Sequence, residues 1–250
     1  MSLPPAAPRE ILIATIADLL SGVRFVAVGA SSPIPAAGAM LLRARNEARG
    51  LERVRIVVLG SREHNFFTNG AVELFDCAAQ GRVDAFFLGG GQIDGQGNIN
   101  LVGTGDYPRT DVRWPGSFGS AFLYYVVPRV ILFREEHSPR VFVDKVDFIS
   151  APGVSEGIVR HGGPYALLTG LALFDFDKSR KRFGLRSVHR GVSAADVRAN
   201  TGFDYDQPAD VPATPEPDAE TLALLRGRVT TELAETYPQF AGTLAAERAA

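Results

Sequence analysis

The chain has 250 residues, of which 46% are hydrophobic and 22% are charged, and its formal net charge at pH 7 is −2. This composition predicts an ordinary globular protein with a substantial core, and the near-neutral charge gives no electrostatic reason to expect nucleic acid or an anionic membrane as a partner. The single cysteine, Cys77, excludes an internal disulfide and a cysteine-cluster metal site.

The hydropathy pattern gives no sign of membrane insertion or export. No apolar segment approaches the roughly 20 residues that a membrane-spanning helix needs. The opening residues, MSLPPAAPRE, lack the basic and apolar regions of a signal peptide. The sequence also contains no metal-ligand spacing and no Walker-type phosphate loop. We therefore expect a cytoplasmic protein without a bound metal.

The amino-terminal part alternates between helical and strand patterns. Apolar residues recur at helical spacing over residues 10–20 and residues 36–48, and residues 24–28 are a predicted strand between them. The loop after this strand, GASSP, places Gly29 and Ser31 where free backbone N–H groups can hold an anionic or carbonyl group. These two residues are candidate substrate ligands, although a plain strand–helix turn explains the same sequence.

The second predicted strand, residues 54–59, is followed by a loop with ionisable side chains. The apolar run VRIVVL leads into GSREHN, which contains Glu63 and His64. A carboxylate in a loop is usually solvated. Glu63 is therefore either a solvated surface residue or a catalytic one. Phe66 and Phe67 then either line a binding pocket or belong to the core.

A third predicted strand, residues 83–88, leads into the glycine-rich stretch GGGQIDGQGNIN. Three consecutive glycines allow a sharp turn and the close approach of another group. A strand that ends in glycines and short amides is a typical ligand-binding position in α/β folds. The candidate substrate ligands here are Gly90, Gly91, Gln92 and Asn98. A glycine-rich hairpin without a ligand is the competing interpretation.

Residues 103–121, GTGDYPRTDVRWPGSFGSA, contain a second set of glycines. The candidate substrate-binding residues in this segment are Arg113, Gly116, Ser117 and Phe118. Arg113 could pair with a substrate carboxylate, and a surface salt bridge is equally compatible with the sequence.

The carboxyl-terminal half is predicted to add strands and two helices. Strands are expected at residues 126–133, 171–176 and 184–189, and Ser193 is a candidate helix N-cap. In the loop after the first of these strands, His137 is expected to be solvated. The proline-rich residues 208–217 are expected to form a linker, residues 218–228 a terminal helix, and the tail beyond Pro238 a loosely held end.

Several of these stretches resemble the β subunits of family I coenzyme A transferases, particularly the glutaconate CoA-transferase type and the related steroid ring-opening hydrolases. They are GASSP, VRIVVL, GGGQIDGQGNIN, PGSFG, VFVDKVDFISAPG and GVSAADVRANTGFD, and the resemblance covers about residues 10–225. It implies an α/β fold of the CoA-transferase type, with an open, mainly parallel sheet flanked by helices, in a single domain over residues 1–250.

The resemblance also implies roles for individual residues. Gly119 matches the family glycine whose backbone N–H binds an oxyanion, and Phe118 replaces the glycine before it, so its ring is expected to fill space that an acyl group uses elsewhere. The family's second strand ends in a nucleophilic glutamate, whereas this sequence has Leu59 or Gly60 there. Glu63 is the nearby carboxylate that could replace it.

The implied substrate is an acyl-CoA, so coenzyme A enters as part of a thioester and no cofactor is bound permanently. The implied partner is a CoA-transferase α subunit, in a heterodimer or a heterotetramer. The missing glutamate favours hydrolysis or ring opening of a cyclic acyl-CoA with a glutamate of the α subunit. CoA transfer between an acyl-CoA and a carboxylic acid, and a non-catalytic structural β subunit, are the alternatives.

Overall fold

The structure, a computed structural model that describes residues 4–68 and 71–247, is built on a seven-stranded sheet. The strand order is β11-β10-β9-β8-β3-β1-β2. Strands β2, β1, β3, β8 and β9 are parallel, whereas β10 and β11 are antiparallel to their neighbours. The strands are β1 (Phe25–Val28), β2 (Arg55–Val58), β3 (Ala85–Leu88), β8 (Arg129–Arg134), β9 (Pro164–Thr169), β10 (Ala172–Asp177) and β11 (Arg182–Val188). The expected mainly parallel α/β sheet is therefore confirmed.

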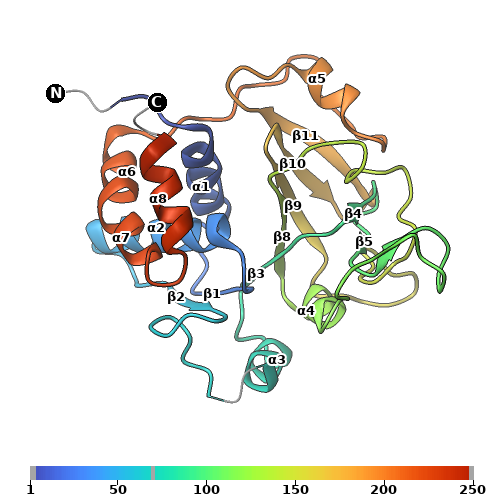
Figure 1. The fold of residues 1–250 in the computed structure, drawn as a ribbon, viewed down its shortest axis with the longest axis horizontal. Coiled ribbons are helices and arrows are strands. Elements are labelled where there is room, and N and C mark those ends of the chain that lie inside the picture. Colours follow the sequence, from blue (N-terminus) through green and yellow to red (C-terminus); the bar gives the residue numbers. More distant parts are fainter. Residues whose placement is uncertain (1–3, 69–70, 248–250) are drawn as a thin grey trace.

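Helices cover one face of the sheet, where they gather on the left of Figure 1. These are α1 (Pro8–Leu19), α2 (Pro33–Ala48), α6 (Ala219–Leu224), α7 (Thr230–Leu233) and α8 (Pro238–Glu247), with the π-helical turn η1 (Leu225–Val229) joining α6 to α7. Their apolar side chains pack with those of β1, β2 and β9 into one hydrophobic cluster. This layer fixes the start of α2 beside the end of β1, which matters for the candidate site below.

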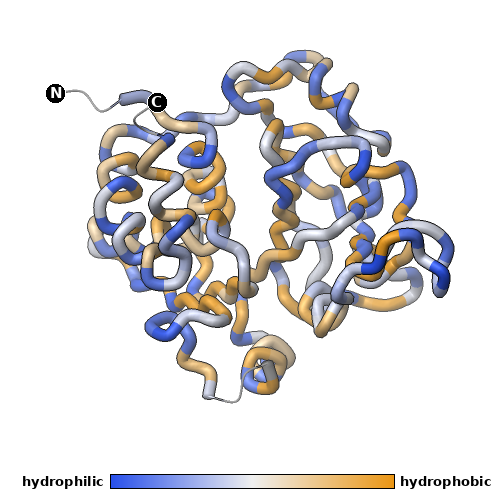
Figure 2. The backbone as a smooth tube through the Cα atoms, in the orientation of Figure 1, coloured by the Kyte–Doolittle hydropathy of each residue, from blue (hydrophilic) through white to orange (hydrophobic). Residues whose placement is uncertain are grey.

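The other face is covered by shorter elements and long loops. These are α3 (Ala71–Ala79), α4 (Ser120–Val126), α5 (Ala194–Ala199) and the two-residue strands β4 (Gln92–Ile93), β5 (Ile99–Asn100), β6 (Gly103–Thr104) and β7 (Val112–Arg113). Their buried residues form a second hydrophobic cluster against the sheet. Figure 2 shows hydrophilic residues concentrated in the peripheral loops of this side. Because β1 and β3 are apolar along their whole length, they are buried between both layers.

Residues 141–153 form no strand of the main sheet. They run beside the small β4–β5 hairpin through isolated bridges, Ile93 to Phe142 and Ile99 to Ala151. The backbone N–H of Ile93 donates to the carbonyl of Val141 at 2.8 Å. The segment therefore fastens the glycine-rich stretch to the second layer.

The carboxyl-terminal region is held more firmly than its composition predicts. The proline-rich residues are not a free linker, because Val188 of β11 bridges to Ala213 and its N–H donates to the carbonyl of Pro212 at 3.0 Å. This contact covers the outer edge of the sheet. The tail expected to be loose forms α8, in which Ala241 and Leu244 are buried. Within the described residues, no helix is long and apolar enough to cross a membrane.

Candidate active site

A cavity of about 500 Å³ lies at the carboxyl ends of the central parallel strands. Its walls come from the start of α2, the end of β3 and the end of β8, closed by one residue each from α1 and α8. The lining residues are Arg9, residues 31–35, residues 87–89, residues 133–136 and Phe240. Ligands of open α/β sheets bind at this edge, so the cavity is the candidate site.

The loop from β1 to α2 is strained at Ser31, which lines the cavity. Its φ is +58°, in the left-handed region that non-glycine residues rarely adopt. Backbone strain of this kind persists mainly at functional sites. The N–H of Ser31 makes no hydrogen bond with any described residue, whereas that of Ser32 donates to the hydroxyl of Tyr237 at 3.3 Å. With the positive end of the 16-residue helix α2 behind it, the loop can bind an anionic or carbonyl oxygen.

Two carboxylates at the end of β8 also line the cavity, and the sequence analysis missed them. Glu135 Oε1 accepts a hydrogen bond from Arg9 Nε at 2.7 Å. Glu136 accepts from Arg140 and Ser138, both at 2.8 Å, and these bonds lower the pKa of Glu136 to about 2. A carboxylate with so low a pKa stays ionised and is a weak base and nucleophile. The signal that could have found the pair is two acidic residues directly after a buried apolar strand.

Strand β2 ends without a carboxylate. The residues after it are Leu59 and Gly60, and the chain then turns back, so that Val58 N–H donates to the carbonyl of His64 at 2.9 Å. Glu63 is exposed and lines a different cavity together with Arg53 and Arg55 at the amino end of β2. The structure therefore does not bring Glu63 to the carboxyl edge, and its role as a substitute nucleophile stays a prediction without geometric support.

The amides of the glycine-rich stretch are buried and bonded within the protein. Gln92 Oε1 accepts from Asn100 Nδ2 at 2.8 Å and from the N–H of Asp147 at 2.9 Å. Asn98 Nδ2 donates to Asp94 at 3.0 Å, and its Oδ1 accepts from the N–H of Gly153 at 3.0 Å. These contacts give both side chains a structural role, because they hold residues 141–153 against β4 and β5. Substrate binding by Gln92 and Asn98 stays a prediction.

The glycines of the same stretch are required by contacts inside the chain. A Cβ on Gly91 would lie 2.2 Å from the ring of Trp114, and a Cβ on Gly90 would lie 2.7 Å from the carbonyl oxygen of Gln92. The groups that approach this backbone closely are therefore parts of the protein and not of a ligand. Arg113, in β7, is exposed.

The segment from Gly116 to Gly119 lies on the α3–α4 side of the sheet and does not line the cavity. Gly119 has φ +66° at the N-cap of α4, and its N–H makes no hydrogen bond with a described residue. Ser117 accepts the N–H of Ser120 through its carbonyl at 2.7 Å. The ring of Phe118 is 82% exposed and lies 5.8 Å from that of Phe75. That the Phe118 ring fills space used by an acyl group in relatives stays a prediction, and in this chain the ring faces outward.

The predicted residues thus fall into separate groups. Ser31 lies in the cavity, next to the acidic pair of β8 and Gly89 of β3. Gln92, Asn98 and the neighbouring glycines build the second layer, and Gly119 presents a backbone donor on the α4 side. A site that uses all three groups needs a ligand or a second chain that spans them.

Comparison with known proteins gives the family directly. The family model described as coenzyme A transferase matches residues 13–200. The B-type subunit of the 3-oxoadipate CoA-transferase of Pseudomonas knackmussii is 30% identical over 225 residues, covering 86% of this chain and 82% of its own. The B-type subunit of the glutaconate CoA-transferase of Acidaminococcus fermentans is 31% identical over 57% of this chain and 56% of its own.

Relatives with other reactions are similar over the same region. The IpdB subunit of the cholesterol ring-cleaving hydrolase of Rhodococcus jostii is 28% identical over 84% of this chain and 87% of its own. The crystal structure of IpdAB from the same organism superposes with a TM-score of 0.76 at 26% identity, covering 89% of this chain and 94% of that one. The decarboxylase AibA/AibB shares the fold, with a TM-score of 0.74 at 23% identity over 88% of this chain and 93% of that one. The resemblance seen in the sequence is confirmed, and the chain belongs to the coenzyme A transferase family of enzymes, among its B-type subunits.

Proposed function

We propose that this chain is the β subunit of a heteromeric enzyme that opens or hydrolyses a cyclic acyl-CoA thioester with water, using a glutamate of its α subunit. The observation that carries the proposal is the end of β2, where Leu59 and Gly60 stand without a carboxylate. CoA transfer through an acyl-enzyme needs a carboxylate oxygen as nucleophile, whereas hydrolysis needs a base that activates water.

The other carboxylates near this edge do not fit the role of nucleophile. Glu63 is exposed and lines a cavity together with residues 53–56 at the amino end of β2. Glu136 has a pKa of about 2 because Arg140, Ser138 and Arg134 donate to it. Glu135 is paired with Arg9 at 2.7 Å. A base supplied by the α subunit therefore suits this site better than one from this chain.

The proposed reaction balances with water as the only co-reactant. For a cyclic β-oxo thioester, water attacks the ring carbonyl carbon, and the proton it loses goes to the α-subunit carboxylate. The bond between that carbon and the α-carbon of the thioester then breaks, the α-carbon takes up the proton, and a linear carboxylic acid thioester results. Backbone N–H groups such as that of Gly119 would stabilise the oxyanion, a contribution worth about 10²–10³ in rate per donor.

The exposed aromatic face of α3 and α4 is the proposed contact with the α subunit. Phe118 is 82% and Phe122 40% exposed, and both rings lie within 6 Å of Phe75, at 5.8 and 5.7 Å between centroids. Exposed aromatic clusters of this kind mark protein interfaces. Gly119 lies beside Phe75, and its N–H has no hydrogen-bond partner among the described residues, so a partner docked there would supply the rest of the active site.

CoA transfer is the second candidate function, and the 30% identity to the B-type subunit of the 3-oxoadipate CoA-transferase favours it. In that reaction coenzyme A would pass from the first acyl group to a carboxylic acid, and the first acyl group would be released as a free acid. Water would not enter the product, so the fate of an oxygen label separates the two reactions.

The test uses the chain co-produced with the CoA-transferase α subunit of the same genome. The complex receives 2-oxocyclohexanecarbonyl-CoA and 3-oxoadipate together in ¹⁸O-labelled water. We expect heptanedioyl-CoA with one ¹⁸O in its free carboxylate and no 3-oxoadipyl-CoA. Formation of 3-oxoadipyl-CoA instead would establish transfer, and binding of the thioester without either product would favour a structural β chain. The α subunit alone is the control.

A further inference from the structure

A basic cavity outside the candidate active site lies at the outer edge of the sheet, beside β2. It has a volume of about 340 Å³ and lies between the first residues of β2 and the loop that follows this strand. Its lining residues are Arg43, residues 53–56, Glu63, His64 and Phe66. The lining carries three arginines, His64 and one glutamate. Outside it, Glu232 pairs with Arg43 and Glu47 pairs with Arg53, so Arg55 is the arginine whose charge no ion pair offsets among the described residues.

The cavity contains a buried charged donor without a partner. Arg43 projects from α2 and is 5% exposed. One of its terminal nitrogens, Nη2, pairs with Glu232 of α7, but its Nε has no hydrogen-bond partner among the described residues. A buried charged donor that is left unsatisfied destabilises the fold, because it has lost its hydration without gaining a protein acceptor. An acceptor that enters the cavity would remove this cost.

His64 is the second polar group that lacks a hydrogen bond here. Its Nε2 lies 3.2 Å from Glu232 Oε1 without hydrogen-bonding geometry, and it makes no hydrogen bond within the described part of the chain. The backbone N–H of His64 donates to Ser61 Oγ at 2.8 Å, which fixes the loop. Burial first, and then the charge of Arg43, lower the pKa of His64. An anion beside the ring would have the opposite effect and raise that pKa.

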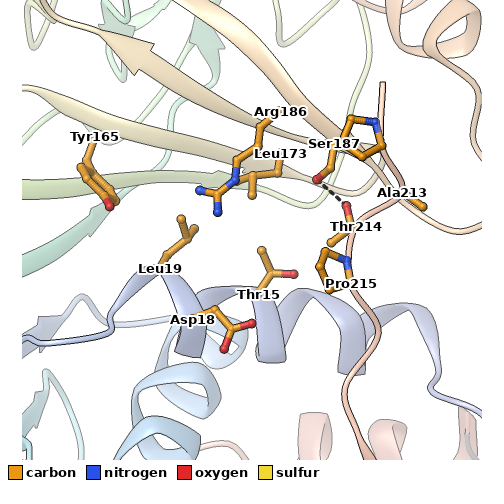
Figure 3. Close-up of a pocket in the computed structure, with 11 residues that line it drawn as sticks. Thr15, Asp18, Leu19, Tyr165, Leu173, Arg186, Ser187, Ala213, Thr214 and Pro215 are labelled. Carbon is orange, nitrogen blue, oxygen red and sulfur yellow. Dashed lines mark hydrogen bonds between the residues drawn. The ribbon is translucent and has the colours of Figure 1, made fainter. Parts of the chain in front are cut away.

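A second cavity, of about 320 Å³ between α1 and the β10–β11 edge, lacks such groups (Figure 3). The hydroxyls of Ser187 and Thr214 bond each other at 2.7 Å, as the dashed line shows. Arg186 pairs with Asp175 at 3.3 Å, and Asp18 pairs with Arg45 at 2.6 Å. Each of these groups has a hydrogen-bond or ion-pair partner within the chain, so none of them requires a polar ligand.

We propose that the cavity beside β2 binds the phosphate group of a small anionic ligand, with Arg43 Nε, Arg53 and His64 as its donors. A phosphate carries up to two charges and three strong acceptor oxygens, which matches several cationic donors better than the single charge of a carboxylate. Phe66, half exposed at 51%, offers an apolar wall for the rest of the ligand. Two sources share this chemistry: a free phosphate ester and the 3′-phosphate of coenzyme A.

The test follows the imidazole of His64 in the full chain, labelled at histidine Cε1 with ¹³C. The chain has four histidines, and His64→Gln identifies the signal. Inorganic phosphate is expected to shift the His64 signal saturably and to raise its pKa, while the exposed His161 serves as internal control. Absence of a saturable shift at His64 with phosphate, with coenzyme A and with an adenosine monophosphate would overturn the proposal.

Variants of the lining residues test whether the shift of the His64 signal arises from binding in the cavity. Arg43→Gln is expected to weaken phosphate binding at least about tenfold, because a charge-assisted hydrogen bond is lost. Because Arg43 is buried, this variant could fail to fold, and Arg53→Ala gives a second measure. The Arg53 side chain is 71% exposed, and its removal is expected to weaken binding about two- to fivefold. Arg180→Ala, exposed to 57% and outside the cavity, should bind as wild type. Equal affinities in all three variants would contradict the site.

The source is decided by comparing coenzyme A with dephospho-coenzyme A. If coenzyme A uses the cavity, only the form with the 3′-phosphate shifts His64, and Arg53→Ala weakens its binding by about the same two- to fivefold as that of phosphate. If free phosphate or the monophosphate shifts His64 and coenzyme A does not, the cavity serves a separate ligand. Both outcomes support a phosphate site, and neither depends on turnover, so failure of the proposed reaction would leave the result intact.

Discussion

At Gly119, backbone conformation and packing both exclude a side chain. Its φ is +66°, and an added Cβ would lie 2.2 Å from Phe75 Cζ. Gly157 has the same φ of +66° but nothing within 4 Å of an added Cβ. The two positions therefore separate backbone strain from steric overlap.

We predict that Gly119→Ala lowers the free energy of unfolding by about 1–3 kcal/mol more than Gly157→Ala, the typical cost of overpacking. Urea denaturation followed by circular dichroism measures both variants against wild type. Equal losses would mean that the Phe75 ring moves aside at no cost. Activity of Gly119→Ala is informative only at temperatures where the variant remains folded.

His137 is half-buried and bonded on both ring nitrogens, contrary to the expectation that it is solvated. Nδ1 lies 2.7 Å from Thr169 Oγ1 and Nε2 lies 2.9 Å from Thr201 Oγ1. Burial, and secondarily the charge of His189, lower the pKa of His137 to about 4. Because the unfolded chain then binds more protons than the folded one between about pH 6.5 and 4, stability falls as the pH falls through this window.

His137→Gln should therefore reduce the acid sensitivity of the fold. The glutamine retains hydrogen-bonding capacity and does not titrate. From the pKa of about 4, the histidine costs wild type about 2 kcal/mol of stability at pH 5 relative to pH 7.5. We predict that the loss between these pH values is smaller in the variant by that amount, measured by urea denaturation at each pH. An unchanged loss would show that His137 titrates normally in the fold.

At the scale of elements, buried parallel strands were the most predictable feature. The apolar runs at residues 24–28, 54–59 and 83–88 match β1, β2 and β3, because a strand covered on both faces is apolar throughout. The expected N-cap Ser193 begins α5 and forms a capping box with Asp196. Strand β9 and helix α4 were missed, because Pro164 and the glycines before Ser120 are usual turn signals.

The candidate site was less predictable than the fold. Ser31 could be placed from its strand–loop–helix pattern, and its position in the cavity agrees with that pattern. Gln92 and Asn98 are of the residue types that bind ligands through side-chain amides. Their hydrogen-bond partners in the structure, such as Asp147 and Gly153, lie more than 50 residues away in the sequence. Distant contacts of this kind leave no local pattern. Glu135 and Glu136 were missed because their importance depends on which strand ends meet.

The terminal helix α8 offers a direct test at this scale. Leu244 is 1% exposed within the cluster formed by α1, α2 and α7, whereas the neighbouring Thr243 is exposed. We predict that Leu244→Ala lowers the free energy of unfolding by about 2–4 kcal/mol, and that Thr243→Ala changes it by about 0.5 kcal/mol or less. Thermal and urea unfolding measure both. A negligible effect of Leu244→Ala would restore the expectation of a loosely held tail.

At the scale of the whole molecule, the aromatic face of α3 and α4 is proposed to bind the α subunit. Phe118→Ser should leave the fold intact because the ring is 82% exposed, and should weaken the complex at least about fivefold, as for an aromatic interface anchor. Leu51→Ser, at a position that is 58% exposed after α2, is the matched control. Sedimentation velocity of the co-produced subunits measures assembly. Equal assembly of both variants would place the interface elsewhere.

The central claim is that this chain supplies no covalent nucleophile, because β2 ends at Leu59 and Gly60. The most direct measurement incubates the complex with the acyl-CoA, adds hydroxylamine or borohydride during turnover, and determines the intact mass of each subunit. We predict that the mass of this chain is unchanged, and that Glu63→Gln retains most of the activity because the exposed loop carboxylate takes no part. A trapped adduct on this chain, at Glu63, Glu135 or Glu136, would contradict the account and identify an ordinary transferase with a displaced carboxylate.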